Sequence, residues 1–131
     1  MTKRRELKGN GEFDYDFVHD ILFFKVKNRV YEKSIEINNM IIDIDSDKFI
    51  AGIQIFDASE YFNIPKKFLS IATSWKFQAT TDKISESEIR VEIRLFFEIK
   101  IRNKIVQPNP IIVQNVETSL PDSRMISVPA R

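Results

Sequence analysis

The stretch IRVEIRLFFEIKIR, residues 89–102, decides the fold class of this chain. Apolar side chains occupy every odd position from Ile89 to Ile101, and every even position except Phe96 carries a charge. A period of two is typical of a strand with one buried face and one exposed face. Such a strand spans about 45 Å, whereas a compact chain of this size is only about 35 Å across. The strand is therefore expected to bend or to protrude.

The same period precedes this stretch in residues 75–80. After it, the Gln-Pro-Asn-Pro sequence at 107–110 predicts a turn at the tip of a hairpin, leading into a strand at 111–116. Toward the N-terminus, short segments rich in aromatic and β-branched residues are separated by Asn- and Asp-containing turns. These segments are residues 13–16, 21–26, 34–38, 40–44 and 49–56. Residues 13–56 are therefore predicted to form a meander of four or five strands.

Residues 57–72 depart from the strand pattern. Asp57 followed by Glu60 is typical of a helix start whose free amides are capped, and Pro65 suits the first turn of a second helical piece. The predicted fold is mainly β with a minor helical segment (a β-rich α+β fold). It consists of an antiparallel meander, a short helical cover and a long C-terminal β-hairpin.

The length of 131 residues fits one domain. Within it we expect a mobile basic leader at 1–12, the meander and helix at 13–72, and the hairpin with an extended C-terminal tail at 73–131. The chain has no cysteine, its basic start is not followed by an apolar run, and no segment approaches the length of a membrane span. A cytoplasmic protein without a membrane partner is expected.

Five blocks in the first half carry a family resemblance. They are Tyr15-Asp16, Asp20-Ile21-Leu22, residues 34–37, residues 43–47 and residues 52–59. From Tyr15 to Ser59 the chain resembles the prokaryotic family called domain of unknown function 2283. It departs from the family at Lys48, where a glycine is usual, and at Gln54, where a glutamate is usual. The resemblance implies a β-meander with a trailing helix, and it leaves open an antitoxin-like role beside a small toxin-like protein.

Acidic residues are the most site-like feature of the sequence. Asp43, Asp45 and Asp47 have the alternate spacing with which calcium loops begin, although Lys48 stands where the tight glycine of such a loop belongs. A carboxylate cluster could serve a metal ion or acid–base catalysis. Its candidate members are Asp16, Asp20, Asp43 and Asp57. The alternative is structural: Asp57 caps its helix, Asp16 and Asp20 form a turn, and Asp43 lies on an exposed strand face.

No catalytic residue and no cofactor is predicted. His19 is the only histidine, and the three glycines form no phosphate-binding loop. The formal net charge is +1, so no large uniform field attracts nucleic acid. The cations at 90, 94, 100, 102 and 104 could track a nucleic acid, but Glu92 and Glu98 interrupt them, and nucleic acid is not an expected partner.

Phe96 is the one apolar side chain on the charged face of residues 89–102, which indicates a contact site. An apolar stripe longer than its own domain can be buried by a second copy of the chain. We therefore predict a homodimer formed by the hairpin of a non-enzymatic protein-interaction module. Its interface candidates are Phe96, Phe97, Ile99, Ile111 and Val113. The alternatives are a metal-dependent enzyme or metal-binding protein using the Asp cluster, and an antitoxin-like or nucleic-acid-associated partner protein.

Overall fold

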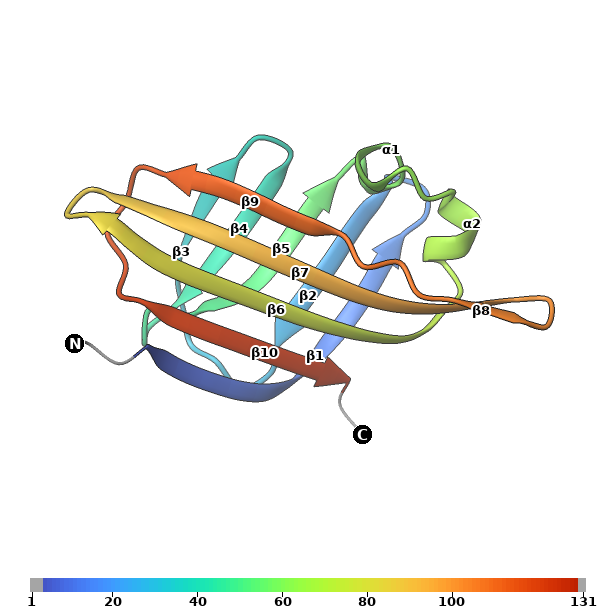
Figure 1. Cartoon of the computed structure of the whole chain (residues 1–131), viewed down its shortest axis with the longest axis horizontal. Coiled ribbons are helices and arrows are strands. Elements are labelled where there is room, and N and C mark those ends of the chain that lie inside the picture. The colour runs from blue at the N-terminus through green and yellow to red at the C-terminus, as the bar shows by residue number, and fades with distance from the viewer. Residues whose placement is uncertain (1–3, 130–131) are drawn as a thin grey trace.

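Strands dominate the computed structural model, which describes residues 4–129 (Figure 1). Two helices of five and four residues accompany them, so the mainly β class with a minor helical part is confirmed. The elements are β1 (Arg5–Asp16), β2 (Ile21–Val26), β3 (Tyr31–Ile37), β4 (Met40–Asp45), β5 (Ile50–Phe56), α1 (Ala58–Phe62), α2 (Lys66–Leu69), β6 (Ala72–Ser85), β7 (Glu88–Ile101), β8 (Lys104–Val106), β9 (Ile111–Val116) and β10 (Ser123–Pro129).

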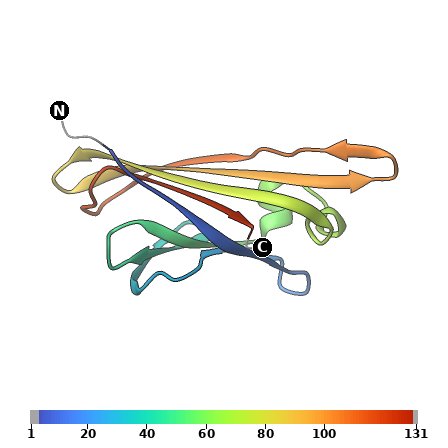
Figure 2. The same cartoon turned by 90° about the horizontal axis from the view of Figure 1, so that it is seen from below.

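All ten strands belong to one sheet, in the order β3-β4-β5-β2-β1-β10-β6-β7-β8. β6 pairs with one side of β7 along its length. β8 and β9 both pair with the other side of β7, at different positions along it, and together form this edge of the sheet. The pairs are antiparallel except for β1 with β10. Seen edge-on, the sheet folds over itself into two facing layers (Figure 2). We call the layer of β1–β5 the first layer and the layer of β6–β10 the second layer.

The core lies between these layers. The odd-numbered residues of β7 from Ile89 to Ile99 point into it, and each is at most 3% exposed. The ring of Phe24 lies 5.5 Å from that of Phe77 and 5.9 Å from that of Phe97, which joins the two layers through aromatic contacts. The first layer therefore buries the apolar stripe of β7, and no second copy is needed for it. Only the far end of β7 protrudes, together with β8 (Figure 1).

The two ends of the chain depart most from the sequence-based prediction. Residues 5–12, expected as part of a mobile leader, form the first part of β1, and residues 1–3 of that leader lie outside the described residues. The C-terminal tail, expected to be extended, forms β10, which pairs with β1 on one side and with β6 on the other. A side chain at Gly11 would collide with Ser127 of β10, so this glycine serves close packing. The pairing of distant segments, which local sequence does not encode, holds both β1 and β10 in the sheet.

The helical segment is shorter than the predicted cover over 57–72. Ala58 and Leu69 are its buried anchors, and the chain leaves the helical conformation at Asn63 in a left-handed residue (φ 54°). Within residues 4–129, neither helix has the length or apolar character needed to cross a membrane.

Candidate functional site

The first polar cluster centres on Asp20, which lies in the turn between β1 and β2 and is 7% exposed. The Tyr15 hydroxyl donates to its carboxylate over 2.5 Å, and the Ser59 hydroxyl donates over 2.7 Å. The backbone amide of Ser59 also donates to it over 3.0 Å. Asp57, predicted as the cap of α1, makes no side-chain cap and sits in a left-handed conformation (φ 53°). That prediction is wrong, because Asp20 caps the helix from a distant turn.

The ionisation of this cluster indicates a structural role. Burial acts to raise the pKa of Asp20, but hydrogen bonds from Ser59 and Tyr15 outweigh it and hold the pKa below its ordinary value. Burial, together with the hydrogen bond to Asp20, raises the pKa of Tyr15 well above its ordinary value. At neutral pH the carboxylate is therefore charged and the phenol keeps its proton. Neither group is poised to exchange a proton during catalysis.

A second cluster occupies the acidic turn between β4 and β5. Asp45 is 1% exposed, and its carboxylate accepts the backbone amides of Asp47 and Phe49, each over 2.9 Å. The Arg29 guanidinium donates to Asp45 over 2.7 Å and to Asp47 over 2.7 Å. These carboxylates also raise the pKa of Arg29, with the hydrogen bond to Asp45 as the largest cause. A guanidinium thus provides the positive charge at this turn, where the sequence suggested the beginning of a calcium loop.

Lys48 closes this turn with a φ of 69°, in the left-handed region that favours glycine. This conformation is the physical reason for the glycine that the family resemblance led us to expect here. The Lys48 ammonium forms an ion pair with Glu32.

The four metal candidates do not form one site. Asp16 accepts hydrogen bonds from the backbone and ring of His19, and Asp43 accepts one from the Ser34 hydroxyl on β3 over 2.7 Å. Asp43 lies opposite Gly52 on β5, whereas Asp57 follows the end of that strand. In the part of the chain that the structure describes, no group of three or more His, Asp or Glu side chains is placed to hold a metal ion.

The five interface candidates fall on opposite faces of the second layer. Phe97 and Ile99 are 2% and 1% exposed and face the core of their own chain, so their prediction as interface residues is wrong. Phe96 lies on the outer face of β7. Ile111 and Val113 lie on the outer face of the neighbouring β9, where they are 50% and 44% exposed.

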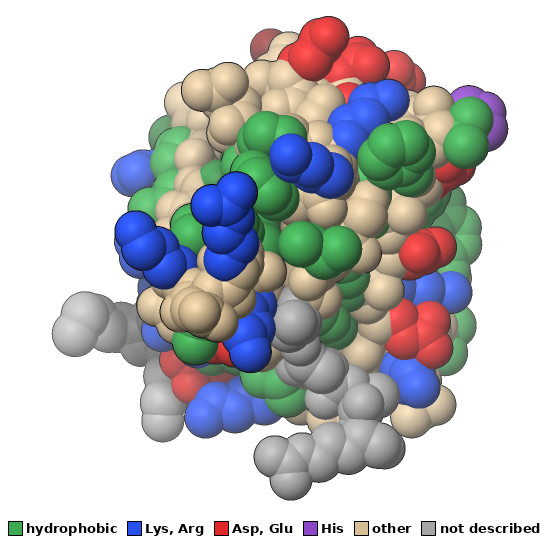
Figure 3. Space-filling view, turned by 90° about the vertical axis from the view of Figure 1, so that its right-hand side faces the viewer, with side chains coloured by type: hydrophobic (Ala, Val, Ile, Leu, Met, Phe, Trp, Pro, Cys, Tyr) green, Lys and Arg blue, Asp and Glu red, His purple; other side chains and the backbone are tan. Residues whose placement is uncertain are grey.

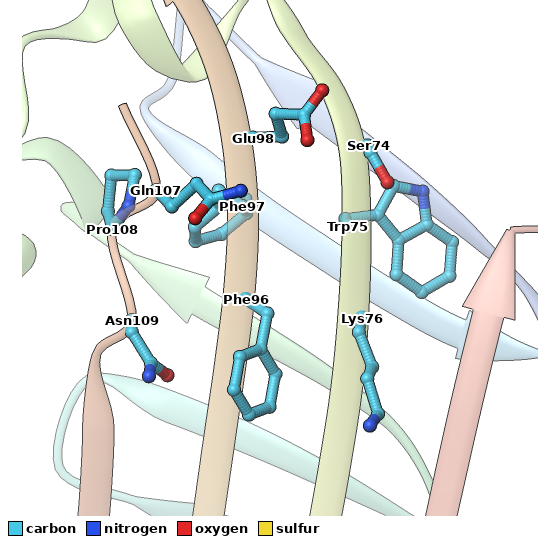
Figure 4. A pocket seen from close by; sticks show the side chains of 9 residues that line it. All are labelled: Ser74, Trp75, Lys76, Phe96, Phe97, Glu98, Gln107, Pro108 and Asn109. Carbon is cyan, nitrogen blue, oxygen red and sulfur yellow. The ribbon is translucent and has the colours of Figure 1, made fainter. Parts of the chain in front are cut away.

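A groove of about 300 Å³ opens on this outer face (Figure 4). Phe96 lies between Lys76 of β6 and Asn109 of the segment after β8, and the Lys76 ammonium lies 5.3 Å from the ring centroid. Glu98 and Gln107 line the end of the groove beyond Phe96. The groove thus combines one aromatic face, one ammonium, two amides and a carboxylate.

The segment 107–110 forms one wall of the groove because of its two prolines. Proline has no amide hydrogen, so the segment binds β7 through carbonyl groups alone. The amides of Leu95 and Phe97 donate to the carbonyls of Pro110 and Pro108 over 3.0 and 3.1 Å. The sequence predicts a turn here, and only the isolated Phe96 signals that a surface site lies beside it.

Comparison with known proteins identifies the first layer. A family model described as "Protein of unknown function (DUF2283)" matches residues 12–59. The chain belongs to this family. The resemblance predicted for residues 15–59 is thereby confirmed, and both carboxylate clusters lie inside the region matched to DUF2283.

Two relatives extend the similarity beyond this region. A Methanosarcina mazei protein named "Putative hypoxanthine phosphoribosyltransferase" is 36% identical over 95 residues, which are 72% of this chain and 73% of the relative. An uncharacterised protein of Methanocaldococcus jannaschii is 27% identical over 100 residues, which are 76% of this chain and 84% of that protein. No solved structure matches the chain.

Proposed function

We propose that this DUF2283 protein is a non-enzymatic interaction module that self-associates through the edge strand β9. The observation that carries the proposal is the unprotected edge of β9. This strand, Ile111–Val116, has no charged residue and no proline, and its register with β7 is unbroken. Within residues 4–129 it pairs with β7 alone. Monomeric proteins protect such edges with charges, prolines or bulges, because an open edge pairs with other chains.

The opposite edge of the same sheet carries the usual protection. β3 includes Glu32, Lys33 and Glu36, and its pairing with β4 is interrupted by a bulge between Tyr31 and Lys33. A twisted, charged strand is a poor template for a second copy. The difference between the two edges supports a partner strand at β9 and none at β3.

A second copy of β9 fits this edge without conflict. Antiparallel pairing about a twofold axis through Val113 places Ile111 opposite the partner's Asn115 on the outer face. No like charges meet, because the strand has none. Twofold pairing is also the commonest form of self-association among soluble proteins.

The solution mass of purified protein, measured by light scattering, tests this proposal. Val113→Lys should convert the dimer to a monomer, because two ammonium groups would meet near the axis. Tyr31→Lys is the matched control, since it adds the same charge at an exposed residue of β3. Both side chains are exposed, so the free energy of unfolding should change by about 0.5 kcal/mol or less. A monomeric wild-type protein, or a Val113→Lys variant that remains dimeric, would overturn the proposal.

A cysteine cross-link tests the register. The chain has no cysteine, so a single substitution gives an unambiguous result. Facing residues of antiparallel strands lie about 4.5–5.5 Å apart, within reach of a disulfide. Val113→Cys should form a disulfide-linked dimer under mild oxidation, and Tyr31→Cys should not.

The activity named for the Methanosarcina mazei relative is not part of this proposal. Phosphoribosyl chemistry needs a cradle for phosphate groups, which backbone amides of glycine-containing loops at helix starts commonly supply. The three glycines of this chain all lie within β1 and β5. No feature of residues 4–129 favours that activity.

A further inference from the structure

Cations gather at one end of the molecule although the net charge is only +1. This basic end comprises α2, the starts of β6 and β8 and the end of β7. Its cations are Lys66, Lys67, Lys76, Lys100, Arg102 and Lys104. None of them takes part in an ion pair within residues 4–129, whereas Arg29, Lys48 and Arg94 elsewhere are paired with carboxylates. Figure 3 shows blue side chains among green ones over the left and centre of this end, with the largest group of carboxylates at the top.

Three lysines at the basic end lie beside aromatic rings. The ammonium of Lys66 is 5.5 Å from the ring of Phe17, and that of Lys67 is 5.2 Å from the ring of Phe68. Lys76 and Phe96 form the third pair, in the groove. A ring beside an ammonium offers a stacking surface for a nucleobase and a charge for the adjacent phosphate.

The groove at Phe96 has the chemistry of a binding site for a nucleobase. Its volume of about 300 Å³ is at the lower end for small-ligand pockets, which suits a single nucleobase. The amides of Gln107 and Asn109 can donate and accept hydrogen bonds at once, as base edges require. Figure 4 shows these amides on one side of Phe96 and the Lys76 ammonium on the other.

The tip formed by β7 and β8 extends the same surface outward (Figure 1). It carries Lys100 and Lys104 on its two strands and Arg102 in the turn, at a φ of 56°. Ile105 beside them is 60% exposed. A projecting two-stranded arm with three cations can follow a phosphate backbone beyond the groove.

From these features we infer that the basic end binds single-stranded nucleic acid, with one base in the groove on Phe96. The cations at 66, 67, 100, 102 and 104 contact the phosphates. The site goes beyond the proposed self-association and does not depend on it, because it uses no residue of β9. A single strand is favoured over a duplex because stacking on Phe96 needs a base that is free of its own pairing.

Fluorescence anisotropy with labelled single-stranded oligonucleotides of about 12 nucleotides tests this inference. Affinity should fall as salt rises, with a logarithmic slope of about −2 or steeper if three or more phosphates are contacted. Phe96→Ala should weaken binding at least about fivefold, the lower range for loss of one stacked base. The triple variant Lys100→Glu, Arg102→Glu and Lys104→Glu should abolish binding.

A charge-matched triple variant is the control. Lys8→Glu, Lys25→Glu and Lys33→Glu change three exposed lysines elsewhere by the same total charge. This control should keep most of the affinity if the basic end is the site. Equal losses in both triple variants, equal affinity for duplex, or unchanged affinity of Phe96→Ala would each overturn the inference. So would binding to vesicles of anionic phosphatidylglycerol without binding to oligonucleotide.

Discussion

The first layer protects its edge strand with charges and a bulge, whereas the second layer leaves an edge strand and a groove open to solvent. In β1–β5 the strands are mostly short, and buried carboxylates at Asp20 and Asp45 tie their turns together. Its edge strand is charged and bulged. In β6–β10 two strands of 14 residues pair along their length, and the edge strand β9 is uncharged. Under the proposed function, this difference separates a scaffold from a contact surface.

This division predicts two kinds of variant. Changes to the carboxylate clusters should lower the free energy of unfolding and leave solution mass and oligonucleotide affinity unchanged. Changes to the outer face of the second layer should alter solution mass or oligonucleotide affinity and leave the free energy of unfolding nearly unchanged. Two changes to buried carboxylates test the first half of this statement, and a third change, at Lys48 in the acidic turn, is expected to have a smaller effect of opposite sign.

Asp45→Ala should have the largest effect, a loss of about 3 kcal/mol in the free energy of unfolding. It leaves two backbone amides without an acceptor and removes one partner of the Arg29 guanidinium. The matched control is Asp47→Ala. The Asp47 side chain is 65% exposed, so its loss should lower the free energy of unfolding by about 1 kcal/mol or less. Urea denaturation of both variants measures the difference. Equal losses of unfolding free energy in the two variants would show that the buried carboxylate of Asp45 has no special structural role.

Asp20→Asn should cost about 2 kcal/mol at neutral pH, because an amide accepts fewer and weaker hydrogen bonds than the carboxylate does. The pKa of Asp20 is lower in the folded chain than the ordinary value of about 3.9. Its contribution to stability is therefore fully present above about pH 5 and is lost as pH falls through the folded pKa.

The difference in unfolding free energy between wild type and Asp20→Asn should therefore stay constant from pH 7 to about 5 and shrink below about pH 4. Denaturation series at fixed pH values measure it. Tyr15→Phe, which removes one donor and keeps the carboxylate, should cost about 1 kcal/mol. If the difference between wild type and Asp20→Asn instead grew on acidification, it would contradict a lowered pKa of Asp20 in the folded chain.

Lys48→Gly should have the smallest effect and the opposite sign, a gain of about 0.5 kcal/mol. Glycine relieves the cost of a left-handed residue, about 1 kcal/mol, while the exposed ion pair with Glu32 contributes less. Lys48→Ala is the control, because it loses the ion pair and keeps the unfavourable φ. Thermal unfolding should rank glycine above lysine and lysine above alanine.

Local pattern was enough to predict most strands and little of the candidate site. The alternation of residues 89–102 and the turn residues of the meander read directly as strands, since side-chain period and turn conformation are local properties. The lone Phe96 pointed to the outer face. Its groove partners Lys76 and Asn109 come from other segments and share no pattern with it. The Asp20 cap was missed for the same reason, because its partner Ser59 is 39 residues away.

The sequence by itself determined the class of the fold, the family of its first layer and the two faces of β7. Only the tertiary structure decided that the first and last strands lie in the middle of the sheet, where β10 joins β1 to β6. It also decided that Phe97 and Ile99 face their own core and that six cations from separate segments gather at one end. The physical reason is that period and turn chemistry act between neighbours, whereas strand order and surface composition depend on contacts between segments far apart in the chain.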